Sequence, residues 1–388
     1  MAMNFLSVYN SLKEFCEKEN YQGWDPYDGL NSKVFKSIPL IRDSRLARLL
    51  WIQFFKRSPI NLRKLLLVPK ELNNKGTGLF LAGYCKEYAF DPSPQILEKI
   101  NYLANLLVRN VSRNYSGACW GYNFDWQARA FFQPKNTPTV VATTFNCNAL
   151  LDSYEITGDE QLLQVARSSC DFILKDLNRT FDKEGNFSFS YSPLDKSVVF
   201  NASLLGSRTL SRVYGFTKET LLIEEAKKSV AFCCNHQKPD GSWSYGLLPF
   251  HRWVDNFHTA YNLECINDYM KFSKDTNFRK HVNVGFEYYI NTFFTDEGIP
   301  KYYNNSIYPI DIHAPAQLVI TLSKLNKFNQ YKGLLDSVLQ WTINNMLSDK
   351  GYFYYQINKY FSSRVPYMRW AQAWMFYALA TYNYEESK

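Results

Sequence analysis

The stretch from Lys218 to Tyr269 reads KETLLIEEAKKSVAFCCNHQKPDGSWSYGLLPFHRWVDNFHTAYNLECINDY. Its first part has apolar residues at helical spacing and leads into a glycine-aromatic turn, Gly241-Ser242-Trp243. A loop of polar and aromatic residues follows, and a second helical pattern begins near His258. The unit is therefore a helix, a turn, a polar-aromatic loop and a second helix. The rest of the chain repeats this unit, and the repeat decides the fold.

The glycine-aromatic turn recurs along the chain. Successive turn glycines are 64, 56, 57 and 53 residues apart, and such self-similarity is the signature of a repeat architecture. Glycine suits these turns because it adopts positive φ without steric cost. The turns lie at Gly121, Gly185, Gly241, Gly298 and Gly351.

Each turn is preceded by an amphipathic helix and followed by a more apolar one. The first kind has one apolar stripe, which predicts an outer helix with a solvent-facing side. The second kind is apolar on most sides, which predicts a helix that is buried on most sides. The outer helices are expected at about 94–112, 159–177, 218–236, 276–294 and 329–347, and the inner helices at about 139–155, 198–214, 258–273, 313–325 and 367–384.

The N-terminal part fits the same plan less regularly, with helices expected at about 3–19, 43–56, 59–70 and 77–90. This gives about fourteen helices in six or seven hairpins. The last inner helix is very apolar and needs a cover, which closure against the N-terminal hairpin would provide. No low-complexity linker divides the chain. We therefore predict an all-α protein, an (α/α)6-type toroid that forms a single domain over residues 1–388.

Composition and charge narrow the kinds of partner. Aromatic residues make up 17% of the 388 residues, which suits both a large core and a cleft that stacks on sugar rings. The chain carries a net charge of +8, but its basic residues form no block or nucleic-acid motif, so no nucleic-acid partner is expected. The densest basic group is expected to be a solvated helix face. It comprises Arg42, Arg45, Arg48, Lys56, Arg57, Arg63 and Lys64.

The sequence also bears on location and cofactors. No apolar run approaches the ~20 residues of a membrane-spanning helix, and the start of the chain lacks a signal-peptide pattern, so a cytoplasmic location is the default expectation. No cofactor or metal motif is evident, and nothing indicates the oligomeric state. The eight cysteines are too irregular for a disulfide framework. Those expected to be small buried side chains are Cys16, Cys85, Cys119, Cys147, Cys170 and Cys265.

Five loop motifs stand out: GWDPYD (23–28), GYNFDWQ (121–127), WVDNFH (253–258), YPIDIH (308–313) and PYMRWAQ (366–372). The outline resembles the six-hairpin, or (α/α)-toroid, superfamily of glycosidases, epimerases, lyases and terpenoid cyclases. From about residue 20 to 380 the motifs resemble proteins encoded with capsular and exopolysaccharide genes, often labelled delta-aminolevulinic acid dehydratase. That dehydratase is a TIM barrel, and this chain lacks the barrel's alternation of strands and helices. The resemblance implies a role in bacterial surface polysaccharide metabolism.

Two related families share local patterns with the chain. The segment QKPDGSW (237–243) is similar to the repeat motif of triterpene cyclases, but their acidic D-x-D-D motif is absent. Lanthionine cyclases hold zinc with two cysteines and a histidine, and Cys233, Cys234 and His236 resemble that set. Two adjacent cysteines do not share one helix face, so we expect a structural role for them.

In a ring of hairpins, the outer-to-inner loops collect at the N-termini of the inner helices. That end is the active-site face in the six-hairpin families, and helix N-termini favour anionic groups. Each Asp or His there is individually explained as well by capping or by semi-burial, but their convergence with tryptophans favours a ligand site. The expected catalytic residues are Asp255, Asp311, His258, His313 and Arg369. The expected substrate-binding residues are Trp24, Asp25, Asp28, Trp120, Asp125, Trp126, Arg129, Asp195, Trp253, Tyr261, Tyr367 and Trp370.

Three functions fit these residues. The first is a glycoside hydrolase-like enzyme acting on an oligosaccharide or polysaccharide, with Asp255 and Asp311 as the carboxylate pair. The second is a polysaccharide lyase or uronate epimerase, in which a histidine or a tyrosine (Tyr261 or Tyr367) moves the proton and Arg369 neutralises the substrate carboxylate. The third is a non-catalytic glycan-binding component of polysaccharide biosynthesis, since an aromatic rim alone would serve that role.

Overall fold

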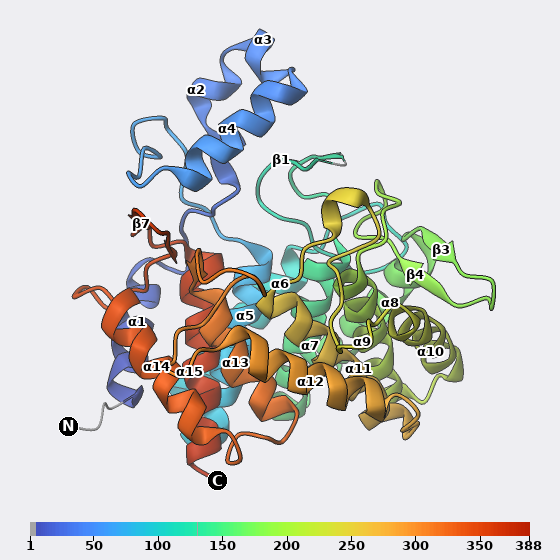
Figure 1. The fold of residues 1–388 in the computed structure, drawn as a ribbon. Helices are drawn as coiled ribbons and strands as arrows, with labels where there is room; N and C mark the ends of the chain where they lie inside the picture. The colour runs from blue at the N-terminus through green and yellow to red at the C-terminus, as the bar shows by residue number, and fades with distance from the viewer. Residues whose placement is uncertain (1–4, 130) are drawn as a thin grey trace.

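The computed structural model describes residues 5–129 and 131–388, and it is mostly helical (Figure 1). Six helices form an inner ring, in which each helix packs against the next. They follow the expected inner ranges, and they begin after a loop that leads in from an outer helix. The inner helices are α5 (Asn74–Phe90), α7 (Val140–Thr157), α9 (Phe200–Thr217), α11 (Asn256–Ser273), α13 (His313–Lys324) and α15 (Ala373–Glu386).

Six outer helices cover this ring and bury one stripe each. In α6, for example, Ile96, Ile100, Leu103 and Leu107 are buried at spacings of three and four, while the opposite face is polar. The outer helices are α1 (Phe5–Lys18), α6 (Pro94–Arg109), α8 (Glu160–Lys175), α10 (Thr220–Asn235), α12 (Arg279–Phe293) and α14 (Lys332–Met346). The expected helix at 3–19 is confirmed as α1, with residues 3 and 4 lying outside the described residues.

The ring closes at the two ends of the chain. Helix α15 packs against α5 and is covered by α1, so the most apolar inner helix is enclosed, as the sequence predicts. Aromatic rings form this contact. The ring centroid of Phe376 in α15 lies 5.1 Å from that of Tyr9 in α1 and 5.3 Å from that of Phe80 in α5. The fold is therefore an (α/α)6 toroid of six hairpins. The expected helices agree with the structure to within a few residues, apart from the segment described next.

Residues 33–67, between α1 and α5, form an insertion that projects from the ring (Figure 1). It contains α2 (Lys33–Lys36), α3 (Pro39–Arg42) and α4 (Arg45–Arg57). The helix expected at 59–70 is wrong, because this segment forms turns. Arg63 turns inward there, and its Nε donates to Asp28 Oδ1 at 2.7 Å. This buried ion pair also corrects the expectation of a fully solvated basic face, since Arg63 is 1% exposed.

Short loops and two- or three-residue strands connect the outer helices to the inner ones. They are β1 (Trp126–Gln127) with β2 (Phe132–Gln133), β3 (Arg179–Phe181) with β4 (Phe187–Phe189), and β5 (Ile310–Asp311) with β6 (Gln356–Ile357) and β7 (Ser362–Ser363). All the expected turn glycines except Gly121 have positive φ. Gly121 is needed for close approach, because a Cβ there would lie 2.3 Å from the Thr137 carbonyl oxygen.

The cysteines are buried free thiols, as expected for the six that sit among apolar neighbours. Cys233 and Cys234 lie inside α10, and Nδ1 of His236 bonds to the Phe232 carbonyl at 2.8 Å. Within the described ranges, no helix combines the length and the apolar character needed to cross a bilayer.

Candidate active site

A cavity of about 580 Å³ opens at the N-terminal ends of the inner helices. Each inner helix, or the turn that leads into it, supplies at least one wall residue, so the cavity lies over the ring axis. Helix α4 of the insertion covers one side. The residues are Lys75 from α5, Val141 from α7, Asn201 from α9, His258 from α11, His313 from α13, and Arg369 from η3, the π-helical turn Met368–Gln372 that leads into α15.

Asp255 and His258 form a hydrogen-bonded pair at the start of α11. Asp255 is the N-cap, and its Oδ1 accepts the backbone N–H of His258 at 3.0 Å. Its Oδ2 lies 2.7 Å from Nδ1 of the His258 ring. Because a carboxylate only accepts, Nδ1 donates its proton to Asp255, and in the tautomer that this bond selects Nε2 is the nitrogen with a free lone pair. Nε2 bonds to no residue in the described part of the chain, and the ring lines the cavity, so His258 has the form of an oriented general base.

His313 begins the next inner helix and is held differently. Its Nε2 lies 2.8 Å from the hydroxyl oxygen of Tyr261, and its ring stacks on Phe257 at 4.1 Å. Burial lowers the pKa of His313 well below its usual value, and the charges of Lys75 and Arg369 act in the same direction. His313 is therefore a neutral imidazole at neutral pH.

Asp311 lies under the cavity wall and is fully buried. Its Oδ1 accepts from the backbone N–H of His313 at 3.0 Å and from Trp370 Nε1 at 2.9 Å, and its Oδ2 accepts from Gln356 at 2.8 Å. Burial raises its pKa to about 6. Neither Asp311 nor Asp255 lines the cavity. The expectation that these carboxylates face a shared cleft is therefore corrected: each is engaged in holding a neighbouring side chain.

Arg369 is the fixed cation of the site. Its Nε and Nη2 donate to the two carboxylate oxygens of Asp25 at 2.6 and 2.8 Å. The Asp25 backbone N–H in turn donates to Asp28, which pairs with Arg63. These four buried residues tie η3 to the N-terminal loop, so the closure of the ring also positions Arg369. The expected substrate-binding roles of Asp25 and Asp28 are corrected, because both carboxylates are engaged in this network away from the cavity wall.

Lys75 is a wall residue that the sequence analysis missed. It is 4% exposed and has no ion-pair partner among the described residues. Its Nζ lies 4.2 Å from the ring centroid of Phe145 and 5.2 Å from that of Trp374. Burial, and then the charge of Arg369, lower the pKa of Lys75 well below its usual value. Lys75 lies in the first turn of α5, just before the helix expected at 77–90, so its place at the cavity was not expected.

The expected aromatic and basic residues divide into two groups. Those that line the cavity are Trp126, Arg129, Trp253, Tyr261 and Trp370. Trp253 stacks on Tyr245 at 4.2 Å, and together they present a flat aromatic wall of the kind that contacts sugar rings. Tyr245 is one of several wall tyrosines that the analysis also missed, with Tyr122, Tyr191, Tyr302 and Tyr303.

The other expected residues lie elsewhere and have structural partners. Trp24 and Trp120 are buried, and their indole N–H groups donate to the carbonyls of Val68 and Leu107. Asp125 accepts the backbone N–H of Lys135, and Asp195 accepts from Ser197. Tyr367 is fully buried beneath Arg63. The residue type, aromatic or acidic, was therefore not enough to predict which side chains line the cavity.

The cavity wall is positively charged. Among the described residues that line it there is no Asp or Glu. The cationic side chains are Lys56, Arg57, Arg129 and Arg369, together with the buried amine of Lys75. With the N-termini of the inner helices aimed at the same space, the site favours an anionic ligand.

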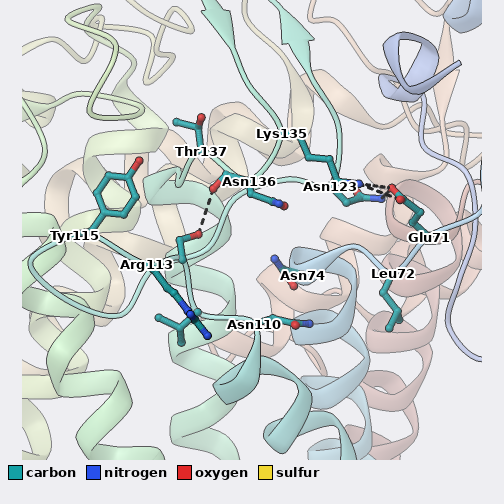
Figure 2. A pocket seen from close by; sticks show the side chains of 12 residues that line it. Glu71, Leu72, Asn74, Asn110, Arg113, Tyr115, Asn123, Lys135, Asn136 and Thr137 are labelled. Atoms are coloured by element: carbon teal, nitrogen blue, oxygen red, sulfur yellow. Dashed lines mark hydrogen bonds and ion pairs between the residues drawn. The ribbon is translucent and has the colours of Figure 1, made fainter. Parts of the chain in front are cut away.

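A second cavity, of about 570 Å³, lies between the start of α5 and the end of α6 (Figure 2). Figure 2 shows Asn123 and Lys135 converging on Glu71, and the Lys135 Nζ lies 2.9 Å from Glu71 Oε1. Lys135 and Glu71 neutralise each other, which leaves Arg113 as the one other charged residue of the described lining, and that lining contains no histidine. The axial cavity is therefore the better candidate for chemistry.

Comparisons with solved structures agree with the fold. The chain is similar to a sugar epimerase from a ruminal bacterium, with a TM-score of 0.66 and 11% identity over 98% of this chain and 99% of that one. It is also similar to cellobiose 2-epimerase from Bacillus thermoamylovorans (TM-score 0.64, 14% identity, 82% of this chain and 90% of that one). A third is an unsaturated glucuronyl hydrolase specific for heparin (TM-score 0.58, 14% identity, 80% and 86%). No protein-family model and no curated protein matches the sequence.

Proposed function

We propose that this protein is a carbohydrate-active enzyme that moves a proton at a carbon of an anionic sugar, as a uronate epimerase or a polysaccharide lyase does. The observation that carries this proposal is the composition of the axial cavity: an Asp-oriented histidine, a buried amine and a fixed arginine, with no carboxylate among its described wall residues. The resemblance of the loop motifs suggests that the sugar belongs to a bacterial surface polysaccharide or its precursor.

The proposed chemistry starts at the carbon next to the sugar carboxylate. Nε2 of His258 removes the proton from that carbon, and the electron pair moves into the carboxylate as an enolate. Arg369 lies at the same cavity and stabilises this anion. A fixed positive charge lowers the energy of negative charge that develops in the transition state. In an epimerase, an acid on the other face returns a proton to the same carbon. In a lyase, the bond to the leaving oxygen breaks, a carbon–carbon double bond forms and the oxygen takes the proton.

Two groups are suited to be the second acid. Tyr261 donates or accepts through its contact with His313, and its ring lies 5.8 Å from that of His258 between centroids. Lys75 lies in the same wall, and burial lowers the pKa of its amine well below the usual value, so the amine gives up a proton more readily than an exposed lysine does.

The hydrolase alternative fits less well. A glycoside hydrolase needs two carboxyl groups that flank the scissile bond. In this site, Asp255 holds His258, and Asp311 holds Trp370 and Gln356 from within the wall. The similar structures include epimerases and a hydrolase, so the fold itself does not decide between these reactions.

The test is to incubate the protein with uronate-containing oligosaccharides in deuterated water. An epimerase incorporates deuterium at the ring carbon, and a lyase produces a conjugated double bond that absorbs ultraviolet light. We expect one of these signals, its loss in His258→Gln, and its retention in Lys135→Gln, which alters only the second cavity. Release of reducing ends without either signal would support a hydrolase. Binding without any product would support the glycan-binding alternative.

A further inference from the structure

The positive charge of this protein is concentrated in the insertion. Residues 33–67 contain nine Lys or Arg residues and a single acidic residue, Asp43, so this stretch has a net charge of +8. The whole chain also has a net charge of +8, and the remaining residues are therefore neutral in sum. Arg63 is buried, but Lys33, Lys36, Arg42, Arg45, Arg57 and Lys64 are exposed.

The same insertion exposes large apolar side chains. On α3, α4 and the residue before α3, these are Ile38, Leu40, Ile41, Leu46, Leu50 and Phe54, and Leu40 is 90% exposed. Leu46, Leu50 and Phe54 are four residues apart and form one stripe along α4. The turns that follow expose Ile60, Leu65 and Leu67. Scattered surface leucines are ordinary, but a concentration of them in the most basic part of a chain requires a specific partner.

We propose that residues 33–67 bind the surface of an anionic lipid bilayer. Leucine and phenylalanine side chains enter the boundary between headgroups and acyl chains, while lysine and arginine contact anionic headgroups. The insertion projects from the ring, so it can reach a flat surface without obstruction from the outer helices (Figure 1). A second copy of this chain is a poorer partner for the same surface, because two insertions would bring together two stretches of +8 charge.

The position of α4 links this surface to the axial cavity. Leu49, Gln53 and Lys56 of α4 line the cavity, and Leu50 belongs both to its edge and to the exposed stripe. A bilayer bound at the insertion would therefore lie beside the mouth of the cavity. This inference concerns attachment to a surface, and it stands whether or not the proposed reaction is correct.

The test is flotation of the purified protein with vesicles of phosphatidylcholine alone or of phosphatidylcholine with phosphatidylglycerol. We expect the protein to float with the phosphatidylglycerol vesicles, and less so at high salt because screening weakens the attraction. The variant Leu40→Gln/Leu46→Gln should lower the partition coefficient by about tenfold or more, since two apolar side chains no longer enter the boundary. Leu194→Gln/Leu221→Gln is the matched control, because these leucines are similarly exposed outside the insertion.

Charge is tested separately. Lys36→Gln/Arg42→Gln should weaken binding to phosphatidylglycerol vesicles, whereas Lys183→Gln/Lys350→Gln removes the same net charge elsewhere and should not. Wild-type protein that fails to float with either vesicle would overturn the proposal, as would equal losses in the test and control pairs. A wild-type dimer that Leu40→Gln/Leu46→Gln converts to a monomer, without vesicle binding, would assign the surface to self-association instead.

Discussion

The starts of α11 and α13 carry similar sequences and hold their histidines in opposite ways. At α11, Asp255 bonds to the ring of His258 and leaves Nε2 facing the cavity. At α13, Asp311 bonds to the backbone N–H of His313 but not to its ring, and Tyr261 holds the ring instead. The first histidine is an oriented base beside the cavity, while the second is a buried neutral ring. Similar motifs one repeat apart therefore perform different tasks.

The spacing of the motif explains the difference. Asp255 is the N-cap and His258 is the third helical residue, so a side chain that leans toward the N-terminus of the helix meets the cap. Asp311 lies two residues before His313 and belongs to strand β5. Its carboxylate turns toward Trp370 and Gln356, which come from the next repeat. Asp255 lies three residues before its histidine and bonds to the histidine ring. Asp311 lies two residues before its histidine and bonds to side chains of a neighbouring loop instead.

The largest expected effect follows from His258→Gln. Removal of a general base lowers the turnover number by about 10²- to 10⁴-fold. The measurement is deuterium exchange or double-bond formation with the uronate substrate. His251→Gln is the matched control, because His251 lines the same cavity but has no carboxylate partner among the described residues. Similar losses in both variants would show that the Asp255 pairing has no special role.

A smaller effect is expected from Asp255→Asn. The amide still caps α11, so the free energy of unfolding should change by only a few tenths of a kcal/mol. The ring of His258 loses its charged partner and its fixed tautomer but remains in place, so the turnover number should fall by about 100-fold, the lower end of the range for a general base. Asp255→Ala should lose the same activity and also about 1 kcal/mol of stability, because the cap is removed.

Kinetics and melting temperature of the two variants separate the two roles of Asp255. Unchanged turnover in Asp255→Asn, together with a lower melting temperature in Asp255→Ala, would make Asp255 a cap only. The proposed base would then have to be found elsewhere in the wall, and Lys75 would be the first residue to substitute.

The repeat predicted the ring, because hydrophobic periodicity and glycine turns are local properties of the sequence. Closure of α15 against α5 also followed, since a very apolar last helix needs a cover. The helix expected at 59–70 was wrong because an ion pair with Asp28, far away in sequence, draws Arg63 inward. Asp25 was expected to bind substrate for a similar reason: its ion-pair partner, Arg369, lies 344 residues away in the sequence. Such partners cannot be read from a single sequence.

The candidate site was predicted in outline, because the starts of inner helices must meet at one end. The two histidines, Arg369 and Trp253 line the cavity at that end, and their catalytic or binding roles stay predictions. Which face of a loop points inward was not predictable, so Asp311 and Tyr367 were placed in a cleft they do not line. Lys75 was missed because its significance comes from burial without a carboxylate partner, which is a property of the fold.

The smallest expected effect concerns His313 and pH. Its pKa in the folded state lies well below the ordinary value of 6.5, so the folded ring stays neutral when the unfolded one takes a proton. Its contribution to stability is complete above about pH 6.5 and is lost as the pH falls, by about 1.4 kcal/mol for each unit. Asp28 and Asp311 act in the opposite sense, since burial raises their pKa to about 6 and stability from them falls as the pH rises from about 4 to 6.

The comparison of wild type with His313→Asn isolates the histidine from these carboxylates. The variant loses packing against Phe257 at every pH, so its unfolding free energy is lower throughout, but it lacks the titrating ring. Between pH 6.5 and 5.5 the stability difference between the two proteins should therefore shrink by about 1 kcal/mol, measured by urea unfolding at each pH. A constant difference across this range would show that the folded ring of His313 takes up a proton at the same pH as the unfolded one. Its ring would then be a second charged group of the site, and the contrast between α11 and α13 would fail.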